Sequence, residues 1–343
     1  MDHRAANGRI CGRQSLAAGL LLALMASGSP VAQAHVAEPP TPESLSTAAA
    51  RAELVPDGTL VKPAFEAATR PDQIGRVIVP VMVNGRGPFL FVVDTGATRT
   101  VLTPQLVAAL GLQSTDDAGV TLNGATGSAV VPTIAVESIA AGDVVLENQQ
   151  LPVAEGLASG IDGILGIDAL ADKRVMIDFA TGKIEIRNAH RERPIQGAER
   201  IAAESRFGGL LVIDAYVDRV HVKAVLDTGS ETTLGNDALR AALSGHAQAQ
   251  ASNALIDVLG ETLALQRAER QTVATLKVGD VRADHFNIAF GQFYIFRLWN
   301  MDRQPALVIG MDLIGKLNAL VVDYDRREVQ LRAQVQPARL THQ

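Results

Sequence analysis

Residues 92–97 read VVDTGA and residues 225–230 read VLDTGS, so the triplet Asp-Thr-Gly occurs twice, each time directly after an apolar run. A single such triplet is typical of a turn, because Asp bonds nearby backbone groups and Gly tolerates positive φ. Turn chemistry does not explain why both triplets follow a strand-like run at the same distance from its start. The pair therefore indicates two related sites, each with a carboxylate at the end of a strand.

The segments around the two triplets are also repeated in the same order. Gly75 and Gly208 each open a β-branched run, and each lies 19 residues before its triplet (94−75 and 227−208). The further matching segments are 142–144 with 279–281, 163–168 with 307–312, 175–178 with 320–323, and 183–186 with 328–331. A repeat of this length predicts that the chain contains one structural unit twice.

Short β-branched runs between Gly, Asn and Asp turns predict an all-β fold of sandwich or barrel character. Helical pattern is confined to short pieces such as 104–110 and 236–243. The length of 343 residues and the hydrophobic content of 47% are sufficient for two lobes with buried cores. The predicted division is signal peptide 1–34, linker or pro-segment 35–74, first lobe 75–190, inter-lobe linker 191–207, second lobe 208–333 and tail 334–343.

The first residues predict export. Arg4, Arg9 and Arg13 precede the apolar run 16–25 and the small-residue site 32–34, the pattern of a Sec-type signal peptide. An uncleaved anchor is the alternative, although the run is short for a membrane span and no later stretch is longer. We expect a periplasmic or secreted protein without a membrane span after cleavage.

Charge and cysteine content exclude several classes of function. The net charge is −6 and no block of Lys and Arg occurs, which argues against a nucleic-acid partner. Cys11 is the single cysteine and falls in the predicted signal, so no disulfide or thiol chemistry is expected. The histidines are scattered without metal-ligand spacing, and neither a nucleophile elbow nor a phosphate loop is present.

The two triplets, each followed later by an apolar-apolar-glycine ending at Gly166 or Gly310, resemble the retropepsin-like aspartic proteases over residues 75–333. The resemblance implies two pepsin- or retropepsin-like β-barrel lobes in one chain, with a peptide cleft between them and a pseudo-twofold axis in a monomer. It implies a peptide or protein substrate, no cofactor and no metal. The residues to which it assigns roles are Asp94 and Asp227 as catalytic acids, Thr95 and Thr228 as ties between the lobes, Gly96, Gly229 and Ser230 as loop supports, and Gly166 and Gly310 as packing behind the loops.

The chemistry of a close carboxyl pair follows from electrostatics alone. Two neighbouring carboxylates do not both ionise readily, so the pair shares a proton, a behaviour for which the aspartic protease dyad is the established example. One carboxylate can then take a proton from water while its partner donates to the developing oxyanion. Ser230 follows the second triplet where Ala97 follows the first. A Ser230 hydroxyl donating to Asp227 would leave Asp94 as the proton holder.

The resemblance also implies a hairpin flap over the cleft. Residues 122–128, with Asn123, Gly124 and Gly127, fit that place in the first lobe, and residues 258–261, with Gly260, fit it in the second. Ordinary surface hairpins are the alternative. The second copy is also longer before its final glycine, since 310−279 is 31 and 166−142 is 24. The aromatic residues there, Phe286, Phe290, Phe293, Tyr294, Phe296 and Trp299, line either a substrate pocket or the core.

These observations predict an aspartic endopeptidase. The alternatives are a catalytically silent peptide-binding module with the same fold and a structural or interaction protein of the cell envelope. Both triplets are intact, which argues against a silenced dyad. Residues 35–74 are also candidates for a segment that blocks the cleft before activation.

Overall fold

The computed structural model describes residues 75–141, 144–157, 160–189, 193–244 and 254–334, and the backbone of four short strands before residue 75. Several predictions fall on residues outside this description. These residues are the predicted signal peptide with Cys11, most of the predicted linker 35–74, residues 142–143, His190, His246 and residues 335–343. The short strands are β1 (Glu53–Leu54), β2 (Leu60–Val61), β3 (Phe65–Ala68) and β4 (Arg70–Pro71).

The first lobe is built on one curved sheet with the strand order β10-β9-β5-β6-β11-β7, in which β8 also pairs with β9 and β4 with β5. Buried and partly exposed residues alternate along β5, as expected of a strand with one face on the core. The strands are β5 (Val77–Val83), β6 (Arg86–Val93), β7 (Val101–Leu102), β8 (Ser114–Asn123), β9 (Ser128–Ala141), β10 (Val144–Pro152) and β11 (Gly163–Leu165).

The second lobe repeats this arrangement in a sheet with the order β15-β16-β17-β22-β18-β21-β20-β19. In each lobe a strand that ends at the Asp-Thr-Gly triplet runs parallel to the strand that ends at the later glycine: β6 beside β11, and β17 beside β22. The strands are β15 (Glu204–Arg206), β16 (Leu210–Val217), β17 (Val220–Leu226), β18 (Leu234–Gly235), β19 (Ala254–Leu259), β20 (Leu265–Val278), β21 (Val281–Phe290) and β22 (Ala306–Ile309).

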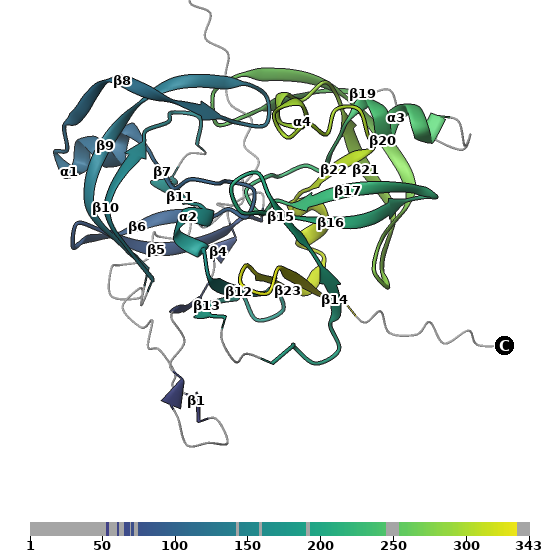
Figure 1. Cartoon of the computed structure of the whole chain (residues 1–343), viewed down its shortest axis with the longest axis horizontal. Helices are drawn as coiled ribbons and strands as arrows, with labels where there is room; N and C mark the ends of the chain where they lie inside the picture. Colours follow the sequence, from purple (N-terminus) through teal and green to yellow (C-terminus); the bar gives the residue numbers. More distant parts are fainter. Residues whose placement is uncertain are drawn as a thin grey trace, which may run out of the picture. The chain divides into compact units, whose positions relative to one another are not determined.

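A third sheet joins the two lobes, with the order β14-β24-β23-β12-β13-β3. Its two central strands are the matching closing strands of the repeat, which pair antiparallel with Met176 opposite Val321. The strands are β12 (Lys173–Asp178), β13 (Lys183–Asn188), β14 (Glu199–Ala202), β23 (Leu317–Asp323) and β24 (Glu328–Ala333). Figure 1 shows this sheet in teal and yellow, with strands from both halves of the chain. Strands β14 and β15 lie within the stretch expected to link the lobes.

The helices are short, and two of them start where the sequence predicts. α1 begins after Thr103, whose hydroxyl accepts from Leu106 N at 3.2 Å, and Asn236 Oδ1 accepts from Leu239 N at 2.9 Å at the start of α3. Such side-chain bonds satisfy free N–H groups of the first turn. The helices are α1 (Pro104–Leu110), α2 (Ile167–Leu170), α3 (Asp237–Ser244), α4 (Tyr294–Leu298) and α5 (Met311–Ile314).

The all-β prediction is confirmed, because strands form the lobes and the sheet that joins them. The apolar faces of the strands form a core that includes Phe91 in the first lobe, Ile288 in the second and Ile177 in the joining sheet. In the described part of the chain, every helix is too short or too polar to cross a bilayer.

Candidate active site

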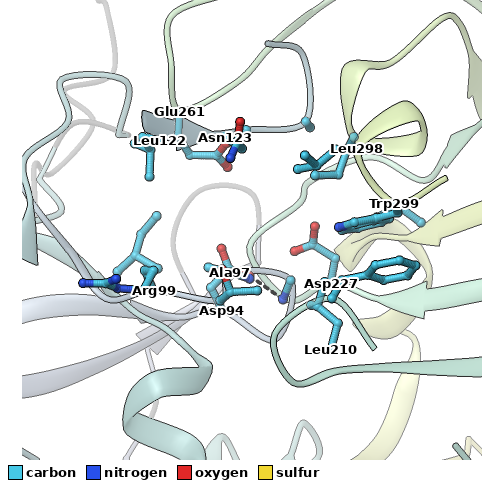
Figure 2. A pocket seen from close by; sticks show the side chains of 18 of the residues that line it. Asp94, Ala97, Arg99, Leu122, Asn123, Leu210, Asp227, Glu261, Leu298 and Trp299 are labelled. Carbon is cyan, nitrogen blue, oxygen red and sulfur yellow. Dashed lines mark hydrogen bonds between the residues drawn. The ribbon is translucent and has the colours of Figure 1, made fainter. Parts of the chain in front are cut away.

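Asp94 and Asp227 occupy equivalent positions in the two lobes. Asp94 follows β6 and Asp227 follows β17, the strands that pair in parallel with β11 and β22. The backbone N–H of each aspartate donates to the carbonyl of the last residue in that neighbouring strand, Asp94 to Leu165 O at 3.1 Å and Asp227 to Ile309 O at 2.9 Å. The sequence predicts this placement, because each aspartate ends an apolar run. The structure adds that the two loops face each other between the lobes (Figure 2).

Each carboxylate is held by the backbone of its own loop. Asp94 Oδ1 accepts from the N–H groups of Gly96 and Ala97 at 2.7 and 3.1 Å. Asp227 Oδ1 accepts from Gly229 and Ser230, both at 2.9 Å. One oxygen of each side chain is therefore fixed, and the outer oxygen stays available for another partner.

Thr95 and Thr228 tie the loops together across the lobe boundary. The Thr95 hydroxyl donates to Leu226 O and the Thr228 hydroxyl donates to Val93 O, each at 2.7 Å. Each hydroxyl also accepts the backbone N–H of the opposite threonine, at 3.1 and 3.2 Å. Both side chains are buried, so these four bonds form away from water and fix the separation of the two loops.

The glycines of the triplets are required for a second reason that the sequence does not reveal. A Cβ on Gly96 would lie 2.5 Å from Oδ2 of Asp227, and a Cβ on Gly229 would overlap the Asp94 carboxyl. Each glycine therefore gives space to the aspartate of the other lobe as well as an N–H to its own. The aspartates approach closely because neither loop carries a side chain at this point.

A repeated bond network supports each loop from behind. The Thr100 hydroxyl donates to Asp168 at 2.6 Å and accepts from Gly166 N at 3.2 Å. In the second lobe Thr233 donates to Asp312 at 2.7 Å and accepts from Gly310 N at 3.1 Å. The two glycines were expected from the sequence as supports of the loops, whereas these threonines and aspartates were not. Their signal was the repeat itself, since 100−94 and 233−227 are both 6.

Burial raises the pKa values of both aspartates, and the charge of Asp94 also raises that of Asp227. Burial is the largest cause for both side chains, and for Asp227 the charges of Asp94 and Glu261 raise the pKa further. The loop N–H groups act in the opposite direction. Because the two carboxyls interact, the apparent pKa values belong to the pair rather than to either aspartate.

The hypothesis about Ser230 is wrong in its premise. Its hydroxyl donates to Thr232 O at 3.0 Å, while its backbone N–H bonds Asp227. Ala97 supplies the same N–H in the first lobe, so this difference in sequence makes no difference to the bonds that either carboxylate receives. The reason for assigning the proton to Asp94 is therefore removed.

Both candidate flaps lie over the aspartates and touch each other. The turn of the β8–β9 hairpin is closed by Gly124 N donating to Gly127 O at 2.8 Å, and that of β19–β20 by Gly260 N donating to Ala264 O at 3.2 Å. Between the tips, the Thr126 hydroxyl donates to Ala264 O at 2.7 Å. A Cβ on Gly260 would overlap the Thr126 hydroxyl. The first hairpin also reaches α4, where Tyr294 donates to Asn123 Oδ1 at 3.1 Å.

A cavity of about 380 Å³ lies between the hairpins and the aspartates. Asp94 and Asp227 lie at its floor, while Asn123 and Glu261 lie at its roof (Figure 2). The end formed by the second lobe is apolar, with Phe207, Leu298 and Trp299, whereas the opposite end combines Arg99 with Leu122 and Val101. The volume is in the range of small-molecule and peptide side-chain sites.

The aromatic cluster of the second lobe serves the core and the cavity together. Phe286, Phe290, Phe293 and Phe296 are buried, while Trp299 is buried and also lines the cavity, stacked on Phe207 with ring centroids 5.9 Å apart. The sequence left open whether these aromatic residues form the core or line a pocket. The buried phenylalanines belong to the core, and Trp299 belongs to both.

Two related β lobes, each contributing an aspartate to one cavity through loops tied by threonines, define the architecture of an aspartic protease. The family model for aspartyl proteases matches residues 79–169 and again residues 213–313. The chain belongs to the aspartyl protease family, and the resemblance drawn from the two triplets is confirmed. Among curated proteins, none matches the chain.

Proposed function

We propose that this protein is an active aspartic endopeptidase that hydrolyses peptide bonds with Asp94 and Asp227. The observation that carries the proposal is the arrangement of the two carboxyls, each with one oxygen fixed by its own loop and both facing one cavity. The family match supports a protease-like function.

In the proposed reaction a water molecule lies between the two outer carboxylate oxygens. The ionised carboxylate takes a proton from the water while the water oxygen attacks the peptide carbonyl carbon. The protonated carboxyl of the other aspartate donates its proton to the carbonyl oxygen. A tetrahedral diol forms without a covalent bond to the protein. Its collapse breaks the C–N bond as the leaving nitrogen is protonated, and the raised pKa values of the pair keep one proton available for these transfers.

Substrate would lie in the cavity below the two hairpins. The hairpin tips are in contact through Thr126 and Ala264, so a peptide has to separate them to enter along the cleft. Closure over the peptide would exclude water other than the attacking molecule. The N-terminal sequence pattern supports action in the periplasm or outside the cell. The two lobes of one chain supply both aspartates to the cavity, which supports action as a monomer.

The test is cleavage of a diverse peptide library between about pH 3 and pH 8, with products identified by mass spectrometry. We expect Asp94→Asn and Asp227→Asn each to lower the rate at least roughly a thousandfold. Asp284→Asn, which alters an exposed ion pair with Arg282, is the matched control and should keep full activity. Binding of peptides without cleavage by the unmodified protein would instead identify the silent peptide-binding module.

A further inference from the structure

Glu261 is a carboxylate at the site to which the reaction described above gives no role. It lies at the tip of the β19–β20 hairpin and lines the cavity that contains Asp94 and Asp227. Figure 2 shows its side chain at the roof beside Asn123, on the opposite side of the cavity from the two aspartates.

The position of Glu261 is fixed from two sides. Its carboxylate lies against the first hairpin, where a Cβ on Gly124 would approach Oε2 to 2.9 Å, and it accepts the backbone N–H of Ala125. Its backbone packs so closely on the loop at Gly156 that a Cβ there would overlap the Glu261 carbonyl. The side chain is therefore held over the cavity by two segments of the other lobe.

Glu261 adds a carboxylate to the roof of a cavity whose floor is acidic. Burial, followed by the charge of Asp94, raises the pKa of the Glu261 carboxyl, and the charge of Arg76 acts in the opposite direction. Asp227 lies across the same cavity and Glu155 lines the neighbouring groove. When Glu261 is ionised, a substrate meets the charge of the aspartate pair below and that of Glu261 above, with Arg99 at one end of the cavity.

We propose that Glu261 is a specificity-determining residue, which selects a substrate with a cationic side chain, Lys or Arg, close to the bond that is cleaved. This inference rests on the proposed protease function. The long aliphatic stems of Lys and Arg can pack on the apolar walls while the charged end reaches the carboxylate. A neutral side chain would displace water from the Glu261 carboxylate without offering a charged partner in its place. An acidic side chain would be repelled.

The experiment uses peptide pairs that differ only by Lys or acetyl-lysine, placed in turn at each of the two positions on either side of the cleaved bond. We expect the protein to prefer Lys roughly tenfold in kcat/KM at one of these positions near neutral pH. Glu261→Gln should bring this ratio close to one. Glu155→Gln, which removes a nearby exposed carboxylate outside the cavity, should keep it. The preference should also fade at acidic pH, because protonation removes the Glu261 charge.

Two outcomes overturn the proposal. One is cleavage of the Lys and acetyl-lysine peptides by the unmodified protein with equal kcat/KM. The other is a Lys preference that Glu261→Gln leaves unchanged; if both rates fell equally, Glu261 would only hold the hairpins together.

Failure of the protease proposal is detected separately. Dissociation constants of the same peptides are measured with Asp94→Asn and with Asp94→Asn/Glu261→Gln. A Lys preference in binding that requires Glu261, without cleavage by the unmodified protein, would keep this inference and reject the protease. Cleavage without any Lys preference would keep the protease proposal and reject the role of Glu261. Absence of both binding and cleavage would reject both proposals.

Discussion

The two lobes are nearly the same where they hold the aspartates and different where they line the rest of the cavity. Both supply one carboxylate, two loop N–H groups, one threonine tie and one threonine–aspartate support from behind. Among the described residues, only the second lobe has a helix, α4, with aromatic residues between the last long hairpin and the final glycine, and Glu261 has Ala125 of the first hairpin against it. The comparison indicates that symmetry positions the two aspartates, while asymmetry shapes the rest of the cavity.

The largest effect is expected from breaking the symmetric ties. Thr95→Val and Thr228→Val each remove a buried hydroxyl that bonds a carbonyl and an N–H of the other lobe. Leaving these groups without partners should cost about 2–4 kcal/mol of unfolding free energy in each variant. Urea denaturation measures this. The two losses should be equal within about 1 kcal/mol, and the double variant should lose less than their sum, because both ties hold the same pair of loops together.

The control for the ties is Thr272→Val, which removes an exposed hydroxyl bond to Asn287. Its unfolding free energy should change by less than about 0.5 kcal/mol. If one tie proves far more important than the other, the lobes are not equivalent at their contact.

The next prediction concerns Asp94 and Asp227, whose replacement by Asn should raise the stability of the protein while it lowers the proposed activity. Both pKa values are raised, so at these two sites the folded protein binds more protons than the unfolded chain. The contribution of the pair to stability should therefore fall as pH rises above about 3.9, the pKa of Asp in an unfolded chain. Asp94→Asn and Asp227→Asn remove this loss, and each should be more stable than the unmodified protein at pH 7, by roughly 1 kcal/mol or more. Denaturation at pH 4 and pH 7 tests this, and a gain at pH 7 that does not exceed the gain at pH 4 would contradict it.

The asymmetric part of the comparison is tested by Leu298→Ala. Leu298 lines the cavity with 43% of its surface exposed, so its loss should change stability by less than about 1 kcal/mol. It should lower kcat/KM for substrates with a large apolar side chain about 5- to 20-fold, as expected for about 1–2 kcal/mol of lost contact. Leu122→Ala, at the end of the cavity formed by the first lobe, should affect a different substrate position. If both variants weaken the same position, the two ends of the cavity do not select separately.

The symmetric half of the site could be predicted from sequence because it is written twice. Asp94 and Asp227 each close an apolar strand, and the equal spacing to Gly75 and Gly208 indicates equivalent loops. Thr100 and Thr233 also occupy matching positions in the repeat. Their role could not be predicted, because residue type alone does not show which group a threonine hydroxyl bonds. Their bonds to Asp168 and Asp312 depend on a contact between segments more than 60 residues apart, |i−j| being 68 and 79.

Only part of the asymmetric half could be predicted. The longer second copy and its aromatic residues are visible in the sequence, but the contacts at the roof of the cavity depend on how the two lobes meet. Glu261 reads as an ordinary polar residue at a hairpin turn, and its position over the cavity follows from contacts with Gly124 and Gly156 of the other lobe. Ser230 shows the reverse case, in which a suggestive residue type bonds Thr232 rather than the carboxylate beside it. Residue type and spacing specify a repeated loop better than they specify a contact made once.

The smallest expected effect is at Tyr324, the counterpart of Phe179. Each follows the last residue of its closing strand and donates its N–H to the other lobe, Tyr324 to Lys173 O at 3.1 Å and Phe179 to Asn318 O at 2.9 Å. The Tyr324 hydroxyl is buried and has no hydrogen-bond partner among the described residues. Burial, and then the charges of Asp94 and Asp227, raise the pKa of its phenol, which stays neutral.

Tyr324→Phe gives the second lobe the residue of the first. A buried hydroxyl without a partner is unfavourable, so its removal should leave the unfolding free energy unchanged or raise it by up to about 1 kcal/mol. The profile of kcat/KM against pH should also stay in place, because the hydroxyl makes no bond to either aspartate. A stability loss above about 1 kcal/mol, or a shifted acidic limb, would mean that this hydroxyl bonds a partner in the working protein. The asymmetry between the lobes would then extend below the aspartates to the sheet that joins them.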